Sequence, residues 1–115
     1  MTFYRNPGPA AEEIARWRGP LVLEFGVEDC PYCQRARPLM AQALARYPGW
    51  PLVQVEDGRG RPLGRAFQVR QWPTFVLLQD GREQSRLVRP EALELILQAM
   101  ERVSTLTEAS QSPHE

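Results

Sequence analysis

Three short apolar segments most constrain how this chain of 115 residues can fold. They are Leu21–Phe25, Leu52–Val55 and Thr74–Leu78. Each has the length and the nearly continuous apolar character of a strand that is covered on both faces. None approaches the roughly 20 apolar residues that a membrane-spanning helix needs. The segments therefore predict three core strands within a single domain and argue against a membrane protein.

Helical periodicity marks the stretches around these strands, because apolar residues recur there three and four positions apart. The predicted helices lie around Ala10–Trp17, from Pro31 to the breaker pair Pro48-Gly49, near Pro62–Phe67, and from Pro90 onward. From Ser104 to Glu115 the chain is rich in Ser, Thr and Glu and lacks an apolar stripe. We expect one domain over residues 1–103 and a flexible tail over residues 104–115.

The order of these elements predicts a mixed sheet. A helix that connects two neighbouring strands places them parallel, so Leu21–Phe25 and Leu52–Val55 should be parallel. Asp80-Gly81 is a hairpin signal, which predicts an antiparallel return strand near Glu83–Val88. The expected fold class is α/β, with a mixed sheet of four strands flanked by helices on both faces. A fifth strand would be formed by Thr2–Tyr4.

The balance of charges and the small number of metal-binding side chains argue against some classes of function. The chain carries 14 basic residues, all arginine, and 14 acidic residues, so its formal net charge is zero. This balance argues against a nucleic-acid partner. One histidine and two cysteines are too few for a closed zinc site within one chain, so we expect no metal and no bound cofactor. The N-terminal sequence has no apolar signal region, and we therefore expect a cytoplasmic protein.

The two cysteines form the motif Cys30-Pro31-Tyr32-Cys33 where the first strand gives way to the long helix. Proline is favoured at the first position of a helix, so Pro31 should be N1 and Cys30 the N-cap. The Cys30 sulfur would then lie near free N–H groups at the positive end of the helix dipole, which stabilise a thiolate. Cys33 lies on the apolar stripe and should be buried. The motif predicts an attacking thiol with a resolving thiol behind it, although two incidental core cysteines would have the same spacing.

At these positions the sequence resembles the thioredoxin superfamily, over roughly Ile14 to Val103. Four features match in order: the Cys-x-x-Cys pair after the first core strand, Glu24 six residues before Cys30, Pro38 eight residues after it, and Trp72-Pro73-Thr74 directly before the third core strand. The Pro-Tyr pair between the cysteines is similar to that of glutaredoxins. The resemblance implies a thioredoxin fold and the activity of a thiol–disulfide oxidoreductase.

Glu24 interrupts the first apolar run and should be partly buried there, where desolvation raises the pKa of a carboxyl group. Thioredoxins carry a buried aspartate at this position. The resemblance therefore implies that Glu24 exchanges a proton with Cys33, directly or through water. A glutamate at the edge of the strand that reaches solvent is the alternative.

The resemblance also identifies Trp72-Pro73 as the cis-proline loop of the family, which lies beside the cysteines. In the family, the backbone of the residue before this proline pairs with an extended substrate. Trp72 and Pro73, together with Tyr32 of the motif, are therefore the predicted substrate-binding residues. Ordinary core packing is the alternative for Trp72.

The resulting hypothesis is a monomeric thiol–disulfide oxidoreductase with Cys30, Cys33 and Glu24 as catalytic residues. Its partners would be disulfide-containing proteins or small-molecule disulfides, and a thiol reductant that is either thioredoxin reductase or glutathione. Two other functions fit the same motif. One is a dimer whose two Cys-x-x-Cys pairs hold a metal ion or an iron–sulfur cluster, and the other is a binding or adaptor module with little redox activity.

Overall fold

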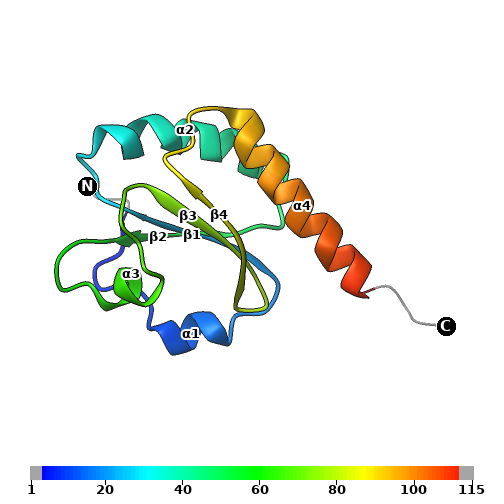
Figure 1. The fold of residues 1–115 in the computed structure, drawn as a ribbon, viewed down its shortest axis with the longest axis horizontal. Helices are drawn as coiled ribbons and strands as arrows, with labels where there is room; N and C mark the ends of the chain where they lie inside the picture. Colours follow the sequence, from blue (N-terminus) through cyan, green and yellow to red (C-terminus); the bar gives the residue numbers. More distant parts are fainter. Residues whose placement is uncertain (1–3, 112–115) are drawn as a thin grey trace.

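The structure, a computed structural model, describes residues 4–111 and contains a central four-stranded sheet (Figure 1). The strands are β1 (Pro20–Gly26), β2 (Leu52–Glu56), β3 (Thr74–Gln79) and β4 (Arg82–Val88). Their order across the sheet is β2-β1-β3-β4, so β1 has a neighbour on each side. β1 pairs with β2 in parallel and with β3 antiparallel, and β3 and β4 form an antiparallel hairpin. The predicted mixed sheet of four strands is confirmed.

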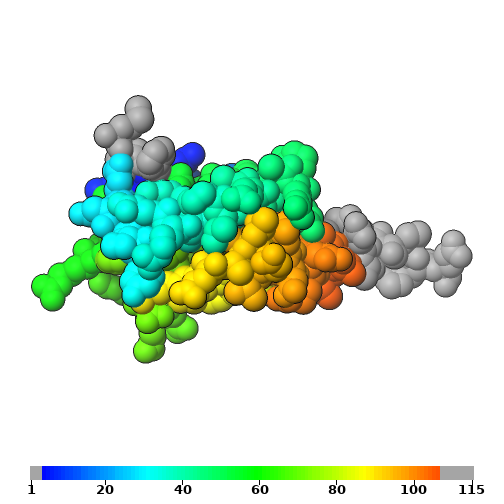
Figure 2. All heavy atoms as spheres, turned by 90° about the horizontal axis from the view of Figure 1, so that it is seen from above, coloured from blue at the N-terminus to red at the C-terminus, as the bar shows by residue number. Residues whose placement is uncertain are grey.

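Helices cover both faces of this sheet (Figure 1). They are α1 (Ala11–Ala15), α2 (Pro31–Ala45), α3 (Pro62–Ala66) and α4 (Leu93–Gln111). α2 and α4 lie on one face, where Figure 2 shows them side by side, and α1 and α3 lie on the other. Within residues 4–111, none of the helices combines the length and the apolar character needed to cross a membrane.

β1 separates two hydrophobic cores because successive side chains of a strand point to opposite faces. Val22 packs with α2 and α4, whereas Leu21, Leu23 and Phe25 pack with α1 and α3. All four side chains are fully buried. The alternation places Glu24 and Gly26 on the same face as Val22, beneath α2, and this decides where the functional groups meet.

Two predictions for the C-terminal part of the chain need correction. α4 begins at Leu93 rather than at Pro90, because Arg89 adopts a left-handed φ of 49° where the chain leaves β4 and turns towards the helix layer. The predicted tail from Ser104 is wrong as far as Gln111, since α4 continues to that residue. No Gly or Pro interrupts this stretch, so the helix can propagate beyond its apolar stripe.

The predicted strand Thr2–Tyr4 falls partly outside the described residues, which begin at Tyr4. Tyr4 itself is not in a strand, and the next residue, Arg5, forms a single parallel bridge with Val55 of β2. Backbone hydrogen bonds run from Arg5 N to Gln54 O (2.8 Å) and from Glu56 N to Arg5 O (3.0 Å). This short pairing fixes the N-terminal segment along the outer edge of β2.

Candidate functional site

Cys30 caps the N-terminus of α2, as predicted, and Pro31 is the first residue of the helix. The backbone of Cys30 is extended, with φ −81° and ψ 121°, which turns its side chain back towards the free N–H groups of the first helical turn. Its sulfur accepts a hydrogen bond from the backbone N–H of Cys33 at 3.4 Å. Cys30 is partly exposed, so this sulfur is both accessible and placed at the positive end of the helix dipole.

Cys33 lies one helical turn further along and is completely buried, with an exposed fraction of 0%. Both cysteines are free thiols in the structure. Burial raises the pKa of the Cys33 thiol to about 11, and the neighbouring Cys30 sulfur raises it too, whereas hydrogen bonds with the Val27 backbone and the Tyr4 hydroxyl lower it. Cys33 therefore holds its proton at neutral pH and needs a base before it can act as a nucleophile.

Glu24 is also completely buried, so the alternative of a solvent-exposed strand-edge carboxyl is wrong. Its carboxylate accepts hydrogen bonds from the Tyr4 hydroxyl at 2.5 Å and from Gln54 Nε2 at 3.2 Å. Gln54 is its register partner on β2. Burial raises the pKa of the Glu24 carboxyl, while these two hydrogen bonds and the charge of Arg37 oppose that rise. A carboxyl of this kind can take up a proton more readily than an exposed one.

Tyr4 also lies at this site, although the sequence analysis did not identify it. Its side chain is buried, and its hydroxyl contacts Glu24 and accepts a hydrogen bond from Arg37 Nη1 at 3.1 Å. Burial and the bond to Glu24 raise the pKa of this hydroxyl well above its usual range. Tyr4 reaches the site because the N-terminal segment pairs with β2. No periodicity marks that pairing, so no local signal in the sequence could have placed this side chain beside the cysteines.

The Trp72-Pro73 loop lies next to Cys30, and the peptide bond between its two residues is cis. The carbonyl oxygen of Trp72 is 4.0 Å from Cys30 Sγ, and it accepts a hydrogen bond from Arg89 Nε at 2.9 Å. The antiparallel pairing of β1 and β3 explains this proximity, since it brings the end of β1 and the start of β3 to the same edge of the sheet.

The indole ring of Trp72 is held by a buried carboxylate rather than by core packing alone. Trp72 Nε1 donates a hydrogen bond to Asp57 Oδ2 at 2.8 Å. Asp57 follows β2 and is only 9% exposed. Gly64 of α3 lies directly beneath the Asp57 carboxylate, and a Cβ atom there would come within 2.0 Å of Asp57 Oδ1. The absence of a side chain at Gly64 therefore allows Asp57 to orient Trp72.

We expect Gly64→Ala to displace the Asp57 carboxylate and to loosen Trp72. Overpacking of a buried site costs about 1–3 kcal/mol, so the free energy of unfolding should fall by that amount in urea denaturation. The NMR chemical shift of the Trp72 indole proton should change as its hydrogen bond is lost. Gly49→Ala is the matched control, because no atom lies within 4 Å of a Cβ at that position. Equal stability of the two variants would contradict this role of Gly64.

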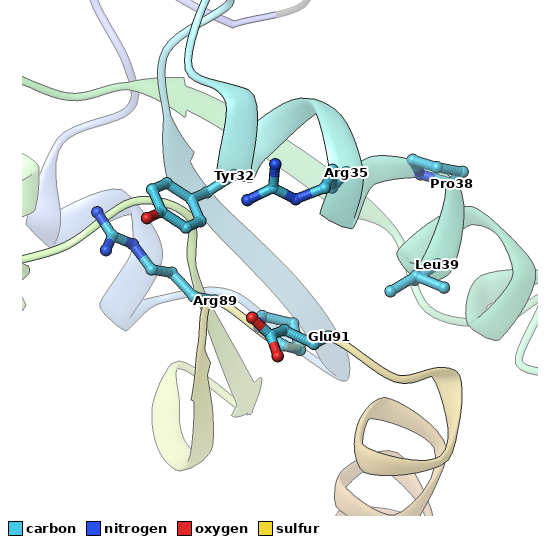
Figure 3. A pocket seen from close by; sticks show the side chains of 7 residues that line it. Tyr32, Arg35, Pro38, Leu39, Arg89 and Glu91 are labelled. Carbon is cyan, nitrogen blue, oxygen red and sulfur yellow. The ribbon is translucent and has the colours of Figure 1, made fainter.

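Tyr32, the third predicted substrate-binding residue, lies at the surface, whereas its neighbour Cys33 is buried. Its side chain is 41% exposed and lines a pocket of about 550 Å³ (Figure 3). Two guanidinium groups lie against its ring, Arg89 at 3.9 Å and Arg35 at 4.9 Å from the ring centroid. Such cation–π contacts are stabilising and hold the ring in place. Arg89 therefore contacts both the motif and the Trp72 carbonyl, and the sequence analysis gave it no role.

The other walls of this pocket are supplied by Pro38, Leu39, Pro90 and Glu91. Within the described part of the chain, no group of three or more His, Cys, Asp or Glu side chains is arranged to hold a metal ion. The structure thus brings together all six predicted site residues at the edge of the sheet where β1 ends and β3 begins. Of these residues, Glu24, Cys33 and Pro73 are buried, whereas Cys30 and Trp72 are partly exposed.

Comparisons with known proteins agree with this geometry. Thioredoxin 2 from Pseudomonas aeruginosa PAO1, in its reduced form, is 47% identical and superposes with a TM-score of 0.79, covering 87% of this chain and 93% of that one. Thioredoxin H5 from Oryza sativa subsp. japonica is 31% identical over 88 residues, which is 76% of this chain and 65% of the relative. Putative thioredoxin H10 from Arabidopsis thaliana is 32% identical over 75 residues, 65% of this chain and 49% of the relative.

The aligned region thus spans 65% of one of these two plant proteins and 49% of the other. Residues 9–102 match the sequence pattern of the Thioredoxin family, whose members are disulfide oxidoreductases. This match covers both cysteines, Glu24 and the Trp72-Pro73 loop. The fold, the arrangement of the two cysteines and the similarity in sequence lead to one conclusion: the chain belongs to the thioredoxin family.

Proposed function

We propose that this protein is a thiol–disulfide oxidoreductase in which Cys30 attacks a disulfide and Cys33 resolves the mixed disulfide. One observation carries the assignment. Cys30 caps α2 with an accessible sulfur that accepts the N–H of Cys33, while the Cys33 thiol is buried behind it. The same helix turn thus holds one sulfur open to a substrate and a second sulfur within reach of the first.

The exchange proceeds in two steps. The Cys30 thiolate attacks one sulfur of the substrate disulfide, a Cys30–substrate bond forms, and the other substrate sulfur leaves as a thiolate. Cys33 then gives up its proton and attacks the Cys30 sulfur, so that a Cys30–Cys33 disulfide forms and the second substrate thiolate leaves. The substrate gains two electrons from the cysteine pair, and an external thiol reductant returns them by the same chemistry.

The substrate would dock between the Trp72-Pro73 loop and the pocket beside Tyr32. An extended peptide can pair with the backbone of Trp72, whose carbonyl oxygen lies 4.0 Å from Cys30 Sγ. The pocket beside Tyr32, with apolar walls from Pro38 and Leu39, would accept a side chain next to the disulfide. Arg89 contacts both the Tyr32 ring and the Trp72 carbonyl and so lies between the two sites. These contacts support Tyr32 and Trp72 as substrate-binding residues, and Pro73 is proposed with them because it lies in the same loop as Trp72.

Disulfide-containing proteins are the proposed substrates, and the protein would act as a monomer in the cytoplasm. A reducing compartment keeps a Cys-x-x-Cys pair in the dithiol form that the first step requires. The proposed reductant is thioredoxin reductase or glutathione. Measuring the rate at which each one reduces the Cys30–Cys33 disulfide would decide between them, and fractionation of cells would test the location.

The activity is tested by the reduction of a disulfide-linked protein such as insulin with dithiothreitol as the electron donor. The purified protein should accelerate the reaction well above the rate of dithiothreitol alone. The double variant Cys30→Ser/Cys33→Ser removes both sulfurs, so it should give no acceleration. A wild-type protein that performs no better than this variant would overturn the proposed function.

A further inference from the structure

The Tyr4 hydroxyl and the Cys33 sulfur meet above Gly26, at the end of β1. A Cβ atom at Gly26 would lie 2.8 Å from Cys33 Sγ and 3.0 Å from the Tyr4 hydroxyl oxygen. Both groups therefore occupy the space that any other residue at this position would fill. The Tyr4 hydroxyl also forms a hydrogen bond with the Cys33 side chain. The glycine is what allows a tyrosine from the N-terminal segment to contact the buried thiol.

Two further hydrogen bonds of the Tyr4 hydroxyl set the direction in which a proton can move. A tyrosine hydroxyl has one proton to donate and two lone pairs that accept. Its proton goes to Glu24 Oε2 at 2.5 Å, and one lone pair accepts Arg37 Nη1 at 3.1 Å. The Cys33 side chain is hydrogen-bonded to this same oxygen, so its thiol proton has a direct path to the hydroxyl. The three groups form a chain from the sulfur through the hydroxyl to the carboxylate.

We propose that Tyr4 is the proton relay of this site, passing the thiol proton of Cys33 to Glu24 during the second step of the exchange. The inference rests on the proposed function. As the Cys33 S–H bond breaks, its proton moves to the Tyr4 oxygen, and the original Tyr4 proton moves to the Glu24 carboxylate. The products are a Cys33 thiolate, a neutral Tyr4 and a neutral Glu24. The thiolate then attacks Cys30, and the proton returns along the same chain when the disulfide is reduced again.

The surroundings of the three groups fit this transfer. The pKa of Tyr4 is raised above its usual range, so the hydroxyl passes protons without being left as a phenolate. The pKa of Glu24 is raised as well, so it lies closer to the pKa of the Cys33 thiol. A smaller difference in pKa between donor and acceptor favours proton transfer. After the transfer, the hydroxyl donates to the Cys33 thiolate and stabilises it, in agreement with its lowering effect on the pKa of Cys33.

Tyr4→Phe tests the relay, because it keeps the buried ring and removes only the hydroxyl. Ellman's reagent, an aromatic disulfide with a coloured leaving thiolate, separates the two steps in a stopped-flow experiment. The first burst of colour reports attack by Cys30, and the second reports attack by Cys33 on the mixed disulfide. We expect the first phase to be unchanged and the second to slow about 100-fold at pH 7, the lower end of general acid–base contributions.

The pH profile distinguishes a relay from a merely structural role. In Tyr4→Phe the second phase should accelerate about tenfold per pH unit below the Cys33 pKa, because only the thiolate fraction reacts. The rate of the second phase in the wild type should depend on pH less steeply. Tyr4→Phe/Glu24→Gln should be no slower than either single variant, since all three interrupt one chain. Tyr47→Phe is the matched control, because Tyr47 packs against Trp50 at the far end of α2.

Three outcomes decide the matter. A second phase in Tyr4→Phe that matches the wild type overturns the relay but leaves the proposed function intact. A wild type that shows no first phase overturns the proposed function itself. If Tyr4→Phe does not fold, the wild-type rate in mixtures of H₂O and D₂O decides, because a two-proton relay gives a curved dependence on deuterium content and a straight line overturns it.

Discussion

Cys30→Ser is expected to abolish disulfide reduction, whereas Cys33→Ser is expected to trap the substrate as a covalent adduct. A serine hydroxyl at position 30 is not ionised at neutral pH and cannot attack a disulfide, so the first step is lost completely. A serine at position 33 leaves Cys30 and its helix cap in place, but removes the sulfur that resolves the mixed disulfide. Electrophoresis without reductant and mass spectrometry of the adduct measure both outcomes.

The difference between the two variants depends on burial, since Cys30 is partly exposed and Cys33 is not exposed at all. Alkylation with iodoacetamide provides the matched measurement on unreacted protein. Cys33→Ser should be modified at Cys30, and Cys30→Ser should resist modification at Cys33. Equal trapping of substrate by both variants would contradict the assignment of attacking and resolving thiols.

Glu24→Gln is expected to slow turnover by about 100-fold, because the amide cannot accept the proton of Cys33. Its shape is nearly that of glutamate, and its oxygen can still accept the hydrogen bond from Tyr4. Alkylation of Cys30 should be unaffected, since the first step does not use Glu24. Glu12→Gln on the exposed face of α1 is the control. Unchanged turnover of Glu24→Gln across neutral pH would show that this carboxyl is structural.

The same substitution should alter how stability depends on pH. The pKa of Glu24 is higher in the folded protein than in the unfolded chain, so the folded state binds its proton more tightly. The resulting contribution to stability is fully present below the unfolded pKa and is lost as the pH rises through the folded pKa. Urea denaturation should therefore show wild type losing stability relative to Glu24→Gln as the pH is raised. A pH-independent difference would contradict the burial of this charge.

The features that follow from local rules could be predicted from the sequence. The three core strands, the parallel crossover and the Asp80-Gly81 hairpin each depend on contiguous residues, and the structure contains them all. The position of Cys30 as the N-cap follows from Pro31 at the start of a helix. The burial of Glu24 follows from its place inside an apolar run. These signals required no knowledge of how distant segments meet.

The groups that surround the sulfurs could not be predicted, because they come from segments that are remote in sequence. Tyr4, Asp57 and Arg89 reach the site through the edge pairing of the N-terminal segment, the loop after β2 and the end of β4. The start of α4 differs from the predicted start for a related reason. Proline is suited to a helix start in general, but the left-handed turn at Arg89 depends on where the chain must travel after β4.

The central position of β1 has a consequence for amide hydrogen exchange. Its amides are covered on both faces and flanked by β2 and β3, so they should exchange only when the whole domain opens, at a cost of about 5–15 kcal/mol. The loop Val27–Cys30 begins directly after this strand, and its amides should exchange through small local openings. Two neighbouring segments of the chain would thus differ in protection by several orders of magnitude. Oxidation of the cysteine pair should slow amide exchange in the loop and leave the order of protection within the sheet unchanged.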